Sequence, residues 1–262
     1  MLQVVIPAFN EEGRLPRTLR ELRRFVRRHR GVLGVVEVIV VDNASTDATA
    51  DVAARASSAT LPVRVIGCAV PGKGAAVAAG VAATDAELVA YLDADGATDL
   101  QALLAAVRLH ATGADVVIGS RAVADADCEA RHSALRAAGA RCYRGLAGRV
   151  VPGVRDTQCG FKVLRGDLAR RTCARLRTHG FSFDVELLAR LQREGAVMVE
   201  VPVRWTDVPG STFDPVRHGA AAFRDLAAIA WLLRRERALP APVSIPVSLP
   251  TLAPRPALEA PA

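Results

Sequence analysis

The sequence predicts an α/β fold with a mostly parallel central sheet flanked by helices. First, short apolar runs rich in valine and isoleucine alternate with segments of helical periodicity. Second, these runs are apolar throughout, as expected of strands that helices cover on both faces. Third, 262 residues with 51% hydrophobic side chains can bury one large core.

Strands and helices are expected in alternation, and functional side chains are expected where strands end. The expected strands are 2–7, 36–42, 62–67, 88–92, 115–119 and 197–203. The expected helices are 11–30, 47–58, 73–83, 99–111, 130–148, 184–194 and about 217–237. In open sheets of this kind, a ligand binds beyond the carboxyl ends of the strands.

One domain is expected over 1–237, followed by a disordered proline-rich tail over 238–262. The tail holds seven of the 15 prolines and only two charged residues. No signal peptide is expected, because Met1 leads directly into the first strand, and no apolar run is long enough to span a membrane. Five cysteines without a CxxC pair predict reduced thiols in a cytosolic protein.

The charge of the chain indicates anionic partners. The formal net charge is +7, and arginine contributes far more of it than lysine. Aromatic residues make up only 4% of the chain, which is too few for the stacking platforms of single-strand nucleic-acid binders. Nucleotide phosphates and anionic lipid head groups are therefore the better expectations, and no nucleic acid is expected.

Polar side chains follow the first two expected strands. "VIPAFNEE" places Asn10 as a helix N-cap with two glutamates in the first turn, and it lacks the glycine-rich turn of a dinucleotide site. "VVDNASTDATA" places Asp42 where it could accept a hydrogen bond from a base or a ribose hydroxyl. A helix cap and a turn cluster explain the two stretches equally well.

A glycine-rich stretch follows the third strand. Residues 67–73 read G-x-x-x-x-G-K, but Gly74 stands where a P-loop has the serine or threonine that binds magnesium. Lys73 between two glycines at a helix start nevertheless suits an anionic group. A plain turn is the alternative.

The fourth strand ends in "YLDADG". Asp93 and Asp95 lie on the same side of an extended chain, so both can reach one cation. Carboxylate oxygens suit Mg²⁺ or Mn²⁺, and a hydrated ion can bridge a substrate diphosphate. The alternative is a polar turn before a helix capped near Thr98. The place of the pair at a strand end favours the metal site.

Two downstream stretches, "VRDTQCGFKVL" (154–164) and "FSFDVELL" (181–188), carry acids in apolar surroundings. Asp156 could cap a turn, and Asp184 could cap the helix that follows it. Together with "PGKGAAVAAG" and "VPVRWTDVPGST", the ordered motifs closely resemble inverting glycosyltransferases of family 2 over residues 1 to about 235. The chain looks most like their dolichyl- or polyprenyl-phosphate glucosyltransferases and mannosyl relatives.

The resemblance implies a GT-A fold, a single Rossmann-like nucleotide-binding domain that uses a nucleotide sugar and a divalent metal. It implies that the nucleotide sugar contacts Pro7, Ala8, Asn10, Glu12, Asp42, Lys73 and Asp93, and that Asp95 binds the metal. It further implies that sugar and acceptor are bordered by Asp156, Gln158, Phe183, Asp184 and Glu186. Asp93, Asp95 and Asp156 would be the catalytic residues.

The chain departs from the family pattern at two places. Asn43 and Ala44 follow Asp42 where the family often has a second aspartate and a glycine. Thr212 stands where relatives commonly have a lysine that could clamp a phosphate. Arg204, Arg217 or His218 could take over that contact.

The expected reaction transfers a hexose, glucose from UDP-glucose, with inversion onto a polyprenyl phosphate. The alternatives are GDP-mannose as donor, a hydroxyl acceptor, or an inactive sugar-nucleotide-binding protein. A hydroxyl acceptor would need a general base, for which Asp156 is the leading candidate, whereas a phosphate acceptor is already ionised near neutral pH.

The lipid acceptor predicts peripheral contact with the inner, cytoplasmic face of the plasma membrane. Two helices combine arginines with an apolar stripe, 11–30 and about 217–237. For the first helix, a solvated charged face over a core-facing stripe is the favoured interpretation. The sequence does not indicate an oligomeric state.

Overall fold

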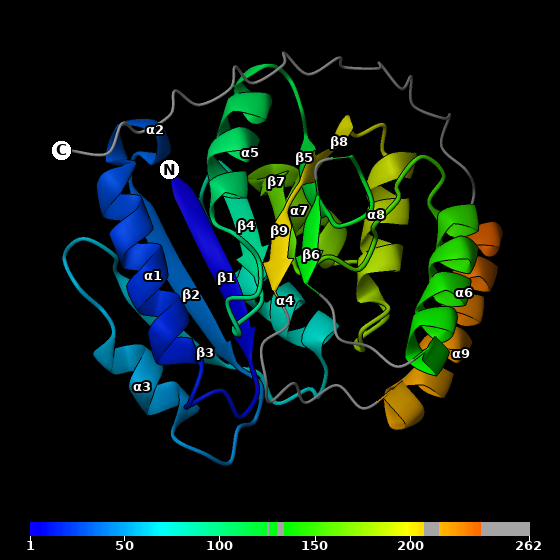
Figure 1. Cartoon of the computed structure of the whole chain (residues 1–262), viewed down its shortest axis with the longest axis horizontal. Coiled ribbons are helices and arrows are strands. Elements are labelled where there is room, and N and C mark those ends of the chain that lie inside the picture. Colours follow the sequence, from blue (N-terminus) through cyan, green and yellow to red (C-terminus); the bar gives the residue numbers. More distant parts are fainter. Residues whose placement is uncertain (125, 130–133, 207–214, 237–262) are drawn as a thin grey trace, which may run out of the picture.

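The structure is a computed structural model that describes residues 1–124, 126–129, 134–206 and 215–236. A seven-stranded sheet lies at its centre, with helices on both faces (Figure 1). The strand order is β3-β2-β1-β4-β7-β5-β8, and all strands of the sheet run in the same direction except β7, which is antiparallel to β4 and β5. The expected α/β class with a mostly parallel sheet is therefore confirmed.

The expected strands form as β1 (Leu2–Ala8), β2 (Val36–Asp42), β3 (Val63–Gly67), β4 (Leu88–Leu92), β5 (Val116–Ser120) and β8 (Met198–Pro202). The sequence reading missed three strands: β6 (Asp127–Glu129), β7 (Phe161–Arg165) and β9 (Arg204–Thr206). β6 and β9 pair in a second, two-stranded sheet. β7 was missed because a lysine, Lys162, is the second residue of this short core strand.

The helices are α1 (Leu15–Arg28), α2 (Arg30–Leu33), α3 (Thr49–Arg55), α4 (Lys73–Ala82), α5 (Gln101–Ala111), α6 (Ala134–Val150), α7 (Gly166–Cys173), α8 (Phe183–Arg193) and α9 (Pro215–Arg235). The expected helix over 11–30 is thus two helices, and α7 was not expected. Within the described part of the chain, no helix is long and apolar enough to cross a bilayer. The predicted tail over 238–262 lies outside the described residues.

Alternating side chains of the strands build a separate core on each face of the sheet. Val4 and Ile6 of β1 pack with α1, α3 and α5. Val5 of the same strand packs on the opposite face, which α4, α6, α7, α8 and α9 cover. Because both faces are buried, the ends of the strands are where the sheet can meet a ligand.

Three expected helix caps are wrong. α1 begins at Leu15, and Asn10 lies before it with a left-handed φ of 54°. α5 begins at Gln101, whose N–H donates to the Asp99 side chain, so Thr98 does not cap it. Asp184 lies inside the first turn of α8, where its carboxylate binds other side chains instead of the helix end.

Candidate active site

The carboxyl ends of β1 and β2 lie side by side, because Ala8 pairs with Asp42 in the sheet. The loops that follow these strands are bonded to each other. Asn10 accepts a hydrogen bond from the Thr46 N–H at 2.9 Å, and its own N–H donates to Ser45 Oγ at 3.0 Å. This edge therefore gathers the residues predicted to line the nucleotide pocket.

Those predicted nucleotide residues differ in what they can offer a ligand. Asn10 and Glu12 are exposed, but Glu12 accepts from the Ala48 N–H at 2.9 Å and so also supports the neighbouring loop. Pro7 and Asp42 are half-buried. Ala8 is buried among core side chains, so only its backbone can face the pocket.

Asn43, which replaces the acid common in the family, ties this edge to the glycine turn before α4. Its amide nitrogen donates to the carbonyls of Cys68 and Val70 at 3.0 and 2.7 Å, and its oxygen accepts from the Gly72 N–H at 2.8 Å. A carboxylate could not donate the first two bonds. The departure from the pattern therefore has a structural reason.

The turn before α4 delivers Lys73 to the end of β4. Gly72 has a φ of 121°, which favours glycine, and a side chain there would overlap the His179 carbonyl. The ammonium of Lys73 lies 2.5 Å from the Asp93 carboxylate. Burial lowers the pKa of Lys73, but the carboxylates of Asp93, Asp184 and Asp95 outweigh it, so the net pKa is raised and the cation is held.

Asp93 also explains a glycine in the downstream motif. The Asp93 N–H donates to the Gly160 carbonyl at 3.1 Å, and a Cβ on Gly160 would overlap the Asp93 carboxylate. The motif "DTQCG" is thus packed directly against the "DAD" motif. The structure brings together the two acidic stretches that the sequence singled out separately.

Asp95 is the half-buried second acid of the pair. One carboxylate oxygen accepts from the Ala97 N–H at 3.0 Å. Burial and the nearby Asp93 charge raise the pKa of Asp95, which is the behaviour of two acids that share a site. A cation between them would relieve that repulsion.

The residues present fit a divalent metal that arrives with its substrate. The part of the chain described in the structure holds no group of three side chains of the kind that ligates metals. Mg²⁺ commonly binds through one or two carboxylates together with substrate phosphates. Asp95, with Asp93 beside it, offers that donor set.

Asp156 is buried, and both of its carboxylate oxygens accept hydrogen bonds from Arg121. It is 1% exposed, and its two oxygens accept from the Arg121 N–H, Nε and Nη2 and from the Gln158 N–H, at 2.7 to 3.3 Å. Burial raises the pKa of this carboxyl, but Arg121 outweighs burial and lowers it. Because its lone pairs accept these hydrogen bonds and its pKa is lowered from the ordinary value, Asp156 is poorly suited to accept a proton.

The sequence reading missed Arg121. The signal was available, because "GSR" directly follows an apolar strand, as the other strand-end motifs do. Arg121 also lies over the Trp205 ring, 5.6 Å from its centroid. Arg121 therefore links Asp156 to the second sheet.

Gln158 lies in the same loop and is half-buried. Its Nε2 is buried, and this atom has no hydrogen-bond partner among the described residues. A buried amide donor without a partner is costly, so it is a candidate contact for an acceptor atom of a ligand.

Three residues predicted to border the sugar and the acceptor are buried and bonded to other parts of the chain, and their contact with a ligand stays a prediction. Phe183 packs in the core. Asp184 accepts from Lys162 Nζ at 2.7 Å and from the Tyr91 hydroxyl. Glu186 accepts from the N–H groups of 177 and 178 and from Arg190 Nε.

The remaining predicted acceptor residues lie at the edges of the described region. Arg204 is exposed and lies 4.0 Å from the Asp99 carboxylate. Thr212 and the side chains of Arg217 and His218 lie outside the described residues, so their predicted roles stay predictions.

The fold corresponds to one that is known from solved structures. Among solved structures, the chain is similar to glucosyl-3-phosphoglycerate synthase from Mycobacterium tuberculosis, solved in complex with Mn²⁺, UDP and glucosyl-3-phosphoglycerate. The TM-score is 0.62 at 20% identity, over 88% of this chain and 79% of that one. The fold is therefore that of a GT-A glycosyltransferase.

The sequence identifies the family. The model of glycosyl transferase family 2 matches residues 3–171. A dolichyl-phosphate beta-glucosyltransferase of Mus musculus is 35% identical, over 90% of this chain and 79% of its own length. One of Drosophila melanogaster is 36% identical, over 88% and 74%. The chain belongs to glycosyl transferase family 2.

Replacing Gly160 with alanine should disturb the site while leaving the fold intact. The new Cβ would displace the Asp93 carboxylate and pull it from Lys73. We expect the affinity for the nucleotide sugar to fall about tenfold, because loss of one charge-assisted hydrogen bond typically weakens binding by about that factor. Gly139 is a matched control, because a Cβ there meets open space. Equal effects of the two substitutions on affinity, measured by calorimetry, would contradict the packing argument.

Proposed function

We propose that the protein transfers glucose from UDP-glucose, with inversion, onto a polyprenyl or dolichyl phosphate. The relatives that share 35% and 36% identity over most of the chain are named for this acceptor and this sugar. The nucleotide would lie against the ends of β1 and β2. The diphosphate would lie at Lys73 and Asp93.

The state of Asp156 is the observation that favours a phosphate acceptor. A hydroxyl acceptor would need a base, and the leading candidate is held by Arg121 with a lowered pKa. The oxygen of a lipid phosphate is already ionised near neutral pH and needs none. Asp156 then acts as a positioning residue that fixes the Arg121 guanidinium.

We further propose dependence on Mg²⁺ or Mn²⁺. When bound, the ion would stabilise negative charge on the departing diphosphate as a Lewis acid. Asp95 would hold it, with Asp93 beside it. Lys73 supplies a fixed positive charge at the same place, since its pKa is raised by the surrounding carboxylates after the opposing effect of burial.

The decisive test is a panel of nucleotide sugars with Mn²⁺ and a short polyprenyl phosphate, scored for the glycolipid formed. We expect the glucosyl lipid from UDP-glucose and little product from GDP-mannose. Transfer only to a hydroxyl acceptor would overturn the proposed acceptor. Nucleotide binding without any transfer would favour an inactive sugar-nucleotide-binding protein.

A lipid acceptor calls for a membrane contact, which we assign to the outer faces of α6 and α9 at the cytoplasmic face of the membrane. The two helices lie side by side at one end of the molecule, opposite α1 (Figure 1). Their exposed side chains include arginines and one tryptophan: Arg141, Arg144, Arg149, Arg224, Arg234, Arg235 and Trp231. Asp225 is the one acid in the sequences of the two helices.

Trp231 is 54% exposed, and the Arg235 guanidinium lies 4.0 Å from its ring centroid. Tryptophan and arginine together are typical of the membrane–water interface. The helices are fixed to the domain, since the Tyr143 hydroxyl donates to Ser182 Oγ, which donates to the Ala222 carbonyl. This face therefore presents a rigid basic surface with an aromatic anchor.

Replacing Arg234 and Arg235 with glutamine should weaken binding to anionic vesicles by about tenfold or more, because each arginine near an anionic surface contributes about 1 kcal/mol. The measurement is co-sedimentation with vesicles that contain phosphatidylglycerol. The matched control replaces Arg20 and Arg23, which lie on α1 at the other end of the molecule. If both pairs weaken binding equally, net charge alone explains it and the assigned face is wrong.

A further inference from the structure

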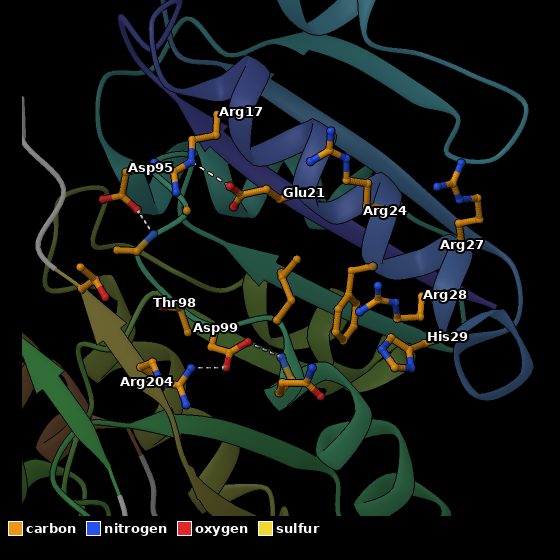
Figure 2. Close-up of a pocket in the computed structure, with 16 residues that line it drawn as sticks. Arg17, Glu21, Arg24, Arg27, Arg28, His29, Asp95, Thr98, Asp99 and Arg204 are labelled. Carbon is orange, nitrogen blue, oxygen red and sulfur yellow. Dashed lines mark hydrogen bonds and ion pairs between the residues drawn. The ribbon is translucent and has the colours of Figure 1, made fainter. Parts of the chain in front are cut away.

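A groove of about 980 Å³ runs along α1, and its lining shares only Asp95, the proposed metal ligand, with the residues that act on the nucleotide sugar in the proposed function. We call it the arginine groove. Its walls are α1, the loop 95–101 and β9, and the residues that the argument uses are Arg17, Arg24, Arg27, Arg28, Asp99 and Arg204. Figure 2 shows Arg17 and Asp95 near one end of the groove, and Arg28 and His29 near the other.

Helix α1 has an apolar face that is buried in the core and an arginine-rich face that lines the groove. Leu15, Leu19, Leu22 and Val26 are buried in the core. The arginines recur at helical intervals on the opposite side, so they line the groove over about 16 Å at 1.5 Å per residue. α1 thus commits most of its apolar side chains to the fold, and only Phe25 among them lines the groove.

The charges in the groove are only partly balanced. Arg17 pairs with Glu21 at 2.8 Å, and Arg204 lies 4.0 Å from Asp99. Arg24, Arg27 and Arg28 also line it, and within the described residues no carboxylate pairs with them. Three like charges along one wall repel each other, and a bound anion would remove that repulsion.

We propose that the arginine groove binds a compact soluble polyanion that carries a di- or triphosphate group. One guanidinium group can bind two oxygens of the same phosphate through two parallel hydrogen bonds. The volume of the arginine groove is in the range of pockets that hold a small ligand. Glu21 and Asp99 on the walls disfavour a continuous anionic surface such as a membrane but leave room for a small ligand. The ligand would lie beside Asp95, whose loop forms one wall.

This proposal goes beyond the proposed transfer reaction, because it concerns a second ligand and does not require turnover. The test is calorimetric titration of the full chain with tripolyphosphate at low salt, with EDTA to keep metal out of the site, and the same titration of a variant in which Lys73, at the proposed diphosphate site, is replaced with glutamine. We expect saturable binding that the Lys73 variant retains. Absence of binding, or its complete loss in the Lys73 variant, would overturn the proposal.

Variants locate the binding. Replacing Arg24 and Arg28 with glutamine should weaken tripolyphosphate binding about tenfold or more. Replacing Arg20 and Arg23 is the matched control: it removes the same charge from the same helix, but these side chains face a different hollow beside α3. We expect that control to bind within about twofold of the parent, the effect of screened net charge. Equal weakening in both variants would overturn the groove as the site.

A binding experiment with lipid vesicles distinguishes a soluble phosphate ligand from the phosphate head groups of a membrane. Vesicles with phosphatidylglycerol should bind the Arg24 and Arg28 variant as they bind the parent, because the lipid contact is assigned to α6 and α9. Loss of vesicle binding in that variant alone would overturn the choice of a soluble ligand. All four arginines are exposed, so the variants should fold, and circular dichroism checks this.

Discussion

Replacing Asp95 with asparagine should lower the rate of sugar transfer by about two to three orders of magnitude while leaving the protein folded. Metal stabilisation of charge at a leaving group amounts to several kcal/mol, and each 1.4 kcal/mol is about tenfold in rate. Asparagine keeps the size of the side chain and the acceptor for the Ala97 N–H but weakens the metal contact. The measurement is glycolipid formation at saturating UDP-glucose and Mn²⁺.

The control for this prediction lies at the other end of the same stretch of chain. Asp85 is exposed and precedes β4, so its replacement with asparagine removes one carboxylate far from the strand's carboxyl end. We expect near-normal transfer from that variant. If the Asp95 variant also retained normal transfer and a normal Mn²⁺ requirement, Asp95 would not be the metal ligand.

The pKa of Asp95 adds a pH dependence with a defined sign. Burial and the Asp93 charge raise this pKa, so the protonated, metal-free form persists to higher pH than for an ordinary aspartate. As the pH falls through the raised pKa, protons displace the metal, and the Mn²⁺ concentration for half-maximal transfer should rise. As the pH rises above it, that concentration should become constant. A requirement for Mn²⁺ that does not change on acidification would contradict this assignment.

The sequence predicted the ends of the strands well because a parallel strand leaves a local signal. An apolar run stops, and polar residues such as Asp42 or Asp93 follow at once. Lys73 was found for a similar local reason, since the glycines on both sides of it mark a turn. Each of these residues then lies at one edge of the sheet because parallel strands all end there.

The sequence could not show which acids are available to a ligand. Asp156 and Asp184 resemble Asp93 in their apolar surroundings, but their partners, Arg121 and Lys162, are 35 and 22 residues away. Only tertiary contacts decide that both carboxylates are occupied. The same holds for Asn10, which resembles a helix cap and instead bonds to the loop after β2.

Strand β7 was not predicted because it contains Lys162, the residue that gives the strand its structural role. The side chain of Lys162 is 0% exposed and lies in the core beside the sheet. Its ammonium donates to the carbonyls of Thr157 and Cys159 at 3.0 and 2.9 Å and to Asp184 at 2.7 Å. Lys162 thereby fastens α8 to the loop that carries Asp156 and Gln158. A buried lysine in a strand is rare enough that patterns of hydrophobicity exclude it.

Replacing Lys162 with methionine should therefore be the most destabilising change. It leaves the Asp184 charge buried without its cation, for which losses of about 3–5 kcal/mol are typical, a large part of the stability of a domain. The measurement is urea unfolding. Arg165, on the same strand but half exposed in surface ion pairs, is the matched control, and its replacement should cost at most about 1 kcal/mol.

A second substitution separates loss of a charge partner from loss of packing. Replacing Asp184 with asparagine in the Lys162 variant removes the stranded charge and keeps an acceptor for the Tyr91 hydroxyl. The double variant should then be more stable than the sum of the two single losses predicts, as expected of residues in direct contact. It still lacks the ammonium that holds the 157 and 159 carbonyls. We therefore expect it to bind UDP nearly normally and to transfer glucose poorly, and strict additivity with normal transfer would show that Lys162 only fills space.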